Sequence, residues 1–95
     1  MLFSLYCVDK PTEGLAIRKE NRPAHIEYLE ANAGKITFAG PTLSDNGETP
    51  TGSLIIIEVA DRAAADEFAS NDPYAKAGVF ESVTIKATRQ VFPKG

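Results

Sequence analysis

The chain is poor in the residues that mark specialised protein classes. Its 95 residues include one cysteine, one histidine, one methionine and no tryptophan. One cysteine cannot form a disulfide within the chain, and one cysteine with one histidine cannot supply the usual four ligands of a structural zinc site. We therefore expect a fold that needs no disulfide and a functional site without a metal.

Long apolar runs and clustered basic residues are missing as well. No segment approaches the roughly 20 apolar residues of a membrane-spanning helix, and the first six residues lack the basic region and cleavage site of a secretion signal. The ten Lys and Arg residues are scattered and outnumbered by 13 Asp and Glu residues, whereas nucleic acids bind to clustered positive charge. We expect a cytoplasmic protein that binds neither membranes nor nucleic acids.

The remaining composition is that of an ordinary globular protein, with 43% hydrophobic and 24% charged residues. A chain of this length buries roughly 60 to 70% of the surface that it exposes when unfolded. Residues 1–95 are therefore predicted to form a single domain with a modest core. Cys7 lies in an apolar segment and is predicted to be a buried side chain rather than a reactive thiol.

Residue patterning predicts four strands and two helices. The helices are indicated by an apolar stripe over Thr12–Asn32 and by Asp61, which is placed to cap a second helix that ends near Ala69. The turn-rich residues Thr42–Thr51 are predicted to form a long loop. The four predicted strands are Leu2–Val8, Lys35–Ala39, Gly52–Val59 and Glu81–Phe92.

The first predicted helix contains a proline. In a helix interior, proline costs about 3 kcal/mol, and this cost is smaller where proline occupies the first turn. We therefore expect a kink or break at Pro23, with Asn21 capping the restarted helix. Gly34 is expected to end the helix in the left-handed conformation.

The order βαββαβ predicts an α+β fold of the ferredoxin-like type, a four-stranded antiparallel sheet with both helices on one face. The third strand, however, is apolar on both faces, with Leu54 and Ile56 on one side and Ile55 and Ile57 on the other. Two helices in one subunit cover only one face of such a sheet. We therefore predict a homodimer that packs sheet to sheet.

His25 is the first candidate for chemistry because it is a titratable group on a core-facing helical stripe. Asp72, in the segment Asn71-Asp72-Pro73, could orient it. A carboxylate that accepts a hydrogen bond from one imidazole nitrogen leaves the other nitrogen with a lone pair for a substrate proton. The alternatives are a packed core histidine and an aspartate that only opens a turn.

Three further residues are candidates for substrate binding. Arg22 shares the helix face of His25 and could hold an anionic oxygen, although a surface arginine paired with a glutamate fits equally well. Ser53 and Tyr74 could donate hydrogen bonds to a ligand. Their alternatives are a polar position at a strand edge and a packed ring with a satisfied hydroxyl.

Other chemistries lack their sequence patterns. No glycine-rich phosphate loop, dinucleotide fingerprint or Gly-x-Ser-x-Gly nucleophile turn is present. The residues therefore favour proton transfer without a cofactor.

These motifs together resemble the YCII-related (YciI-like) family over nearly the whole chain. The resemblance implies a dimeric α+β barrel of ferredoxin-like subunits, similar to muconolactone isomerases, and an active site built on a His-Asp pair, here His25 and Asp72. Dehydrochlorination of a chlorinated hydroxyhydroquinone is a known activity of one member. The matching motifs are Arg22-Pro23-Ala24-His25, Ala39-Gly40-Pro41, Gly52-Ser53, Asp72-Pro73-Tyr74, Ala77-Gly78-Val79-Phe80, Glu81-Ser82-Val83 and Val91-Phe92.

Two functions therefore remain open. The first is a lyase or isomerase in which His25, oriented by Asp72, moves a proton on a small oxygenated organic substrate, with anions among the candidates. The second is a non-catalytic ligand-binding or accessory module that uses the same pocket.

Overall fold

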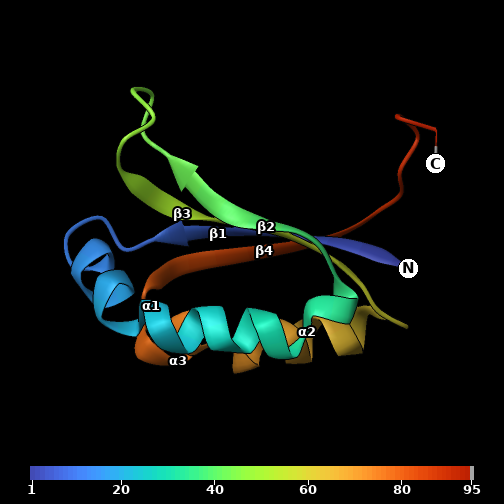
Figure 1. Ribbon diagram of the computed structural model, residues 1–95, viewed down its shortest axis with the longest axis horizontal. Helices are drawn as coiled ribbons and strands as arrows, with labels where there is room; N and C mark the ends of the chain where they lie inside the picture. Colours follow the sequence, from blue (N-terminus) through green and yellow to red (C-terminus); the bar gives the residue numbers. More distant parts are fainter. Residues whose placement is uncertain (95) are drawn as a thin grey trace.

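The computed structural model describes residues 1–94, and the helices pack on one face of a four-stranded antiparallel sheet (Figure 1). The strand order β2-β3-β1-β4 is that of a ferredoxin-like fold, which confirms the predicted α+β class. In chain order the elements are β1 (Leu2–Asp9), α1 (Gly14–Ala31), a 3₁₀ turn (Ala33–Lys35), β2 (Ile36–Leu43), β3 (Pro50–Glu58), α2 (Arg62–Asn71), α3 (Pro73–Ala77) and β4 (Phe80–Thr88).

The core lies between the sheet and the helices. Alternate residues of the two central strands point toward the helices, and the register sets Phe3 opposite Ile57 and Leu5 opposite Ile55. All four side chains are almost completely buried, as is Cys7. Burial and, to a lesser extent, the negative charge of Asp72 raise the pKa of the Cys7 thiol to about 12. The expected buried thiol is confirmed.

Helix α1 runs without interruption through Pro23, so the predicted restart at Asn21 is wrong. The Asn21 side chain does not cap a new helix but donates a hydrogen bond to the Ile17 carbonyl, at 2.9 Å. Proline has no N–H for the carbonyl four residues earlier, that of Lys19. Both residues are exposed, so water can satisfy that carbonyl and the cost of an interior proline falls.

The left-handed glycine at a helix end is Gly78, and the prediction for Gly34 is wrong. Gly34 lies in the 3₁₀ turn after α1 and has no positive φ, whereas Gly78 ends α3 with φ of 82°. Helix α3 itself was not predicted, because five residues are too few to show a helical period. Its start nevertheless carries clear signals, an Asp72 cap followed by Pro73.

The strand boundaries differ from the predicted ones at β2 and β4. Strand β2 continues through Gly40-Pro41 to Leu43, which shortens the predicted loop to residues 44–49. Pro41 is tolerated because β2 is an edge strand, with one side that needs no hydrogen-bond partner. Strand β4 ends at Thr88 rather than Phe92. Asp61 caps α2 as predicted, since its carboxylate accepts the Ala64 N–H at 2.9 Å.

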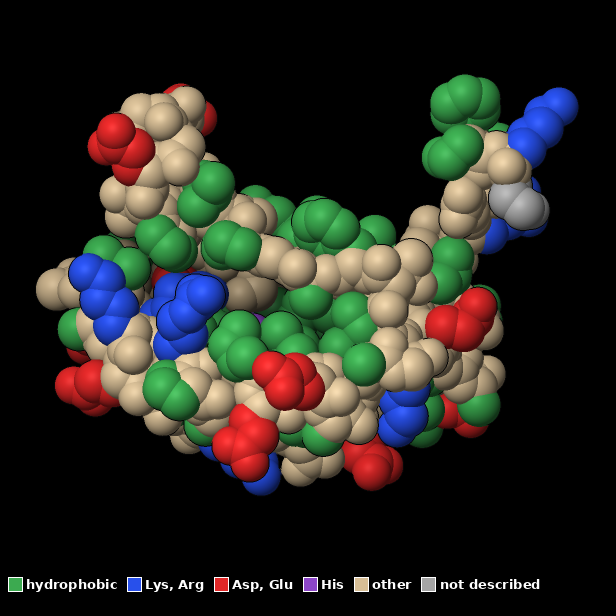
Figure 2. All heavy atoms as spheres, viewed as in Figure 1, with side chains coloured by type: hydrophobic (Ala, Val, Ile, Leu, Met, Phe, Trp, Pro, Cys, Tyr) green, Lys and Arg blue, Asp and Glu red, His purple; other side chains and the backbone are tan. Residues whose placement is uncertain are grey.

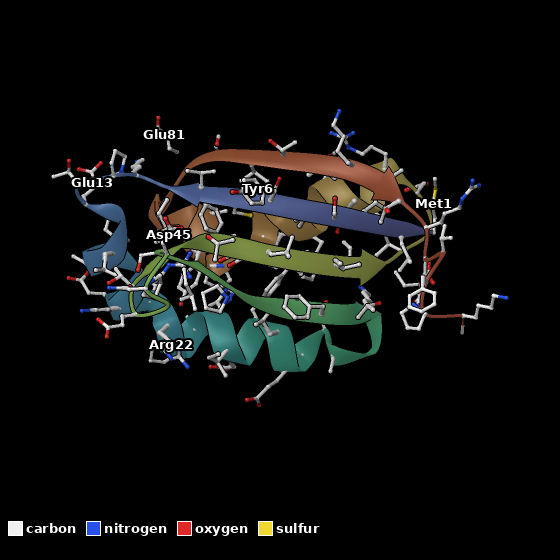
Figure 3. The ribbon with its side chains drawn as sticks, turned by 90° about the horizontal axis from the view of Figure 1, so that it is seen from above. Met1, Tyr6, Glu13, Arg22, Asp45 and Glu81 are labelled. Atoms are coloured by element: carbon white, nitrogen blue, oxygen red, sulfur yellow. The ribbon has the colours of Figure 1, made fainter. Side chains whose placement is uncertain are left out.

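The second face of the sheet carries no helix. The registers place Tyr6, Leu54, Ile56 and Phe38 on it, and Figure 3 looks onto this face, with Tyr6 over β1. Tyr6 and Phe38 are each 51% exposed. The central strands are therefore apolar on both faces, as predicted, while the helices cover only one. No helix within residues 1–94 is long and apolar enough to cross a membrane.

Candidate active site

The structure brings His25 and Asp72 together although 47 residues separate them. His25 lies in the middle of α1, Asp72 lies between α2 and α3, and both side chains are buried. The His25 Nδ1 atom is 2.9 Å from Asp72 Oδ1. Because an ionised carboxylate only accepts hydrogen bonds, Nδ1 is the donor, and the lone pair of the neutral ring then lies on Nε2.

Asp72 has a second contact that fixes its position. The same oxygen, Oδ1, accepts the backbone N–H of Tyr74 at 2.9 Å and so caps α3. The turn-opening role and the contact with the imidazole therefore coexist in one side chain. The helix cap holds the carboxylate, and the carboxylate in turn restricts the rotation of the imidazole ring.

Tyr74 forms a wall beside the imidazole. Its ring stacks on the His25 ring with centroids 3.8 Å apart and planes 9° from parallel, and the guanidinium carbon of Arg18 lies 4.6 Å from its centroid. Burial raises the pKa of the Tyr74 hydroxyl, and the positive charges of Arg18 and Arg22 offset only part of that rise. Tyr74 therefore remains a protonated phenol at neutral pH.

Arg18 is the site residue that sequence reasoning missed. Its Nε and Nη2 atoms donate to the two carboxylate oxygens of Asp9 at 2.8 and 2.7 Å, and Nη2 also donates to Ser53 Oγ at 3.0 Å. Burial on its own would lower the pKa of Arg18, but the hydrogen bonds and charge of Asp9 raise it overall. The available signal was an arginine on the apolar stripe of a helix, where a charge must find a partner.

Arg22 lies on α1 about one turn after Arg18. It is exposed at the outer side of α1 (Figure 3). Within residues 1–94 it makes no ion pair, so the alternative of a glutamate partner is not observed. Arg22 contributes to the rim of the hollow beside His25.

That hollow has a volume of about 220 Å³ and lies between α1 and the strands β2 and β3. In Figure 2 it is the recess below the sheet, where the single histidine shows as a small purple area. One part of its wall is polar and consists of Arg18, Arg22, His25, Ser53 and Tyr74; the other part is apolar and includes Ile26 and Ile55. Four of the five predicted site residues thus reach the hollow, and Asp72 stands behind His25.

A wider groove of about 880 Å³ runs over the helical layer, beside Tyr28 and Phe68. None of the five predicted site residues lines it. Its charged side chains, Glu27, Lys35, Glu67 and Lys76, are all exposed, so none of them is held in place as an acid, a base or a cation for a ligand. The smaller hollow is therefore the candidate active site.

Comparison with known proteins finds relatives over nearly the whole length of the chain. The family model of the YCII-related domain matches residues 1–89. Protein YciI of Escherichia coli is 36% identical over 99 residues, which cover 97% of this chain and all of the relative. An uncharacterized protein of Haemophilus influenzae is 32% identical over 100 residues, with the same shares covered.

Two solved structures share the fold. The 5-chloro-2-hydroxyhydroquinone dehydrochlorinase of Burkholderia phenoliruptrix, in complex with 2,5-dihydroxybenzoquinone, superposes with a TM-score of 0.88 at 35% identity over 94% of each chain. Rv0793 of Mycobacterium tuberculosis superposes with a TM-score of 0.50 at 13% identity over the same shares and supports the fold alone. Together with the family match over residues 1–89, these relatives establish that the chain belongs to the YCII-related family.

Proposed function

We propose that this protein is a cofactor-independent enzyme of the lyase or isomerase type, in which His25 is the general base and Asp72 orients it. The observation that carries the proposal is the buried hydrogen bond between His25 Nδ1 and Asp72. This bond leaves the lone pair of the neutral ring on Nε2, and His25 lines the hollow. The likeness to a dehydrochlorinase over 94% of the chain supports this reaction class.

The proposed reaction begins when Nε2 takes a proton from an acidic O–H or C–H group of the bound substrate. The electron pair of the broken bond forms a new double bond in the substrate. In an elimination, that shift expels a leaving group such as chloride; in an isomerisation, the proton returns to a different atom. Asp72 stabilises the imidazolium that exists between the two steps.

The size of the hollow suits a small substrate. An apolar cavity of about 150 Å³ in another protein holds benzene, so the hollow of about 220 Å³ has room for one substituted ring. Its apolar wall suits the ring, and its polar wall suits oxygen substituents. We propose hydroxylated single-ring compounds as the first substrates to test, with the dehydrochlorinase's 5-chloro-2-hydroxyhydroquinone foremost.

The test is a parallel assay of wild type, His25→Ala and Asp72→Asn. Chloride release from 5-chloro-2-hydroxyhydroquinone, and spectral change with unchlorinated phenols, lactones and keto acids, report turnover. Loss of the base should lower the rate by about 10² to 10⁴-fold, while circular dichroism shows an intact fold. Full turnover by His25→Ala would refute the role of His25. Binding without turnover in wild type would favour the ligand-binding module instead.

We also propose that the protein is a homodimer that packs through the uncovered face of its sheet. Tyr6 and Phe38 are half-exposed there, beside Leu54 and Ile56. Burial of such a contiguous apolar surface against a second copy removes it from water, and a two-fold axis needs only this one face. The result would be the dimeric α+β barrel that the resemblance to the YCII-related family implies.

A further inference from the structure

Arg18 is a buried cation in the wall of the hollow. Only 7% of it is exposed, and Asp9, which holds it through two hydrogen bonds, is buried to a similar degree. A buried ion pair of this kind gives little more stability than apolar side chains of the same volume would give. Its position beside the proposed base therefore points to a role in binding.

The hydrogen-bond donors of Arg18 are only partly used. A guanidinium has five N–H groups. Nε and Nη2 donate to Asp9 and Ser53, whereas Nη1 has no hydrogen bond of good geometry within residues 1–94, although the guanidinium lies close enough to the Tyr74 side chain for that contact to help raise the pKa of Arg18. In the same range, no buried side-chain nitrogen or oxygen lacks a partner, so Nη1 must be accessible, and the space beside Arg18 is the hollow.

Ser53 and Tyr74 contact Arg18 and line the same hollow. The Ser53 hydroxyl accepts its hydrogen bond from Arg18, so its own hydrogen remains available to a ligand. Tyr74 lies against both the guanidinium of Arg18 and the ring of His25, at 4.6 and 3.8 Å from its centroid. Because Arg18 and His25 line the same hollow of about 220 Å³, one small ring could present an oxygen to Arg18 and a proton to His25 Nε2.

We propose that Arg18, fixed by Asp9, binds a negatively charged oxygen of the substrate, and that the site selects planar single-ring compounds with an ionised hydroxyl or enolate oxygen. This inference rests on the proposed function and names the substrate class of the same site. It assigns to Arg18 the role that the sequence suggested for Arg22. Arg22 is exposed at the rim, where water and salt weaken its attraction for an anion.

The physical reason for the selectivity is preorganisation. Arg18 is held by Asp9 and Ser53 before any ligand arrives, so its free N–H groups need no reorganisation to meet an oxyanion. Charge-assisted hydrogen bonds in a buried site are about twice as strong as neutral ones. A neutral ring of the same size lacks the charge that these bonds require and should bind more weakly.

The experiment measures the binding of 2,5-dihydroxybenzoquinone, which is ionised at neutral pH, and of neutral hydroquinone by isothermal titration calorimetry. Removal of Arg18 alone would leave Asp9 buried without its partner. The variant is therefore the double substitution Arg18→Gln with Asp9→Asn, which keeps a neutral hydrogen-bonded pair. Its affinity for the quinone should fall at least about tenfold, and its affinity for hydroquinone should change less than threefold.

Two further variants make the result decisive. Arg18→Lys keeps the charge but loses the planar pair of donor groups, so it should also bind the quinone more weakly. If the double variant does not fold, the quinone affinity of Arg18→Lys tests the role of Arg18 instead. Arg22→Gln should have a smaller effect that disappears in high salt. Wild-type quinone affinity in the folded Arg18 variants, or an equal loss in Arg22→Gln, would overturn the assignment.

Failure of this inference is distinguishable from failure of the proposed function. His25→Ala should still bind the quinone within a few fold of wild type, because the oxyanion is held by Arg18. Turnover by His25→Ala would refute the base and leave the binding result in place. Quinone affinity that is unchanged in the Arg18 variants would refute the role of Arg18 without affecting the proposed role of His25.

Discussion

At the scale of single residues, Asp72 links the helix framework to the proposed chemistry. Its Oδ1 atom accepts one hydrogen bond from the backbone of Tyr74 and one from the ring of His25, both at 2.9 Å. A carboxylate with two donors on one oxygen has little freedom to rotate. Loss of Asp72 should therefore disturb both the start of α3 and the orientation of the imidazole.

The single thiol gives a prediction about reactivity. A pKa of about 12 for Cys7, instead of 9.0, makes the thiolate about a thousandfold rarer at pH 8. Alkylation by iodoacetamide at pH 8, followed by mass spectrometry, should be at least about a hundredfold slower in native protein than in denaturant. Because the unfolded thiol ionises more easily, the thiol also favours unfolding as the pH rises above about 9.

A matched control moves the thiol to the surface. Thr88→Cys in a Cys7→Ala background places it on the exposed end of β4, where labelling should be fast in the native state. Native labelling of Cys7 at the rate seen in denaturant would contradict its burial.

The sequence predicted that the site residues of α1 lie near one another, but it did not predict that Arg18 is buried in the site. The chain spacing of Arg18, Arg22 and His25 shows that they lie near one another on a helix. It does not show which arginine is buried, because that depends on Asp9, which reaches α1 from the end of β1. The burial of each arginine depends on contacts between segments that are far apart in the chain, and these contacts cannot be identified from a single sequence.

At the scale of elements, the close contact of β1 with β3 gives a stability prediction. A Cβ atom on Gly52 would lie 2.1 Å from the Cys7 carbonyl oxygen, so Gly52→Ala must push the two strands apart. We expect a loss of about 1 to 3 kcal/mol in the free energy of unfolding, measured by urea denaturation. Because Ser53 follows Gly52, quinone binding should weaken as well.

Gly34→Ala is the matched control. A Cβ atom there meets nothing within 4 Å, and the residue has no positive φ. The same substitution should therefore change stability by less than about 0.5 kcal/mol. Equal effects at the two glycines would contradict the described packing of β3.

Elements with long patterns were predictable, and short or exceptional ones were not. The strands Leu2–Asp9 and Pro50–Glu58 show their apolar residues over enough positions to be recognised. Helix α3 is too short for such a pattern, and Pro23 is tolerated only because it lies on the exposed side of α1. The continuation of α1 through Pro23 therefore depends on solvent exposure, which the local conformational preference of proline does not reveal.

At the scale of the whole molecule, the uncovered sheet face gives a prediction about assembly. Figure 2 shows apolar side chains along the top of the sheet between two projecting segments. A lysine introduced at Leu54 would place a charge in the proposed interface of each subunit, at a cost of at least about 3 kcal/mol. Leu54→Lys should therefore weaken the dimer more than a hundredfold, as measured by sedimentation velocity.

The control adds the same charge on the helical layer. Ala31→Lys lies on an exposed part of α1, and the variant should sediment like wild type. A wild-type protein that is monomeric at micromolar concentration would exclude the sheet-to-sheet dimer.

The overall topology was the most predictable property of the molecule. The order of strands and helices leaves few ways to bury the apolar face of each element, and the ferredoxin-like sheet is one of them. The hollow was not predictable in shape, because it depends on how far α1 stands from β2 and β3. The reaction depends in turn on which groups line that hollow.

In the proposed active site, Asp72 holds His25 with its lone pair on Nε2, and the most direct test is ¹⁵N NMR of the single histidine. In the neutral ring, long-range proton-nitrogen spectra should show a protonated Nδ1 and an unprotonated Nε2. Asp72→Asn should remove this preference, because an amide side chain can also donate to Nδ1. A wild-type ring that carries its hydrogen on Nε2, as free imidazole side chains in water mostly do, would contradict the account.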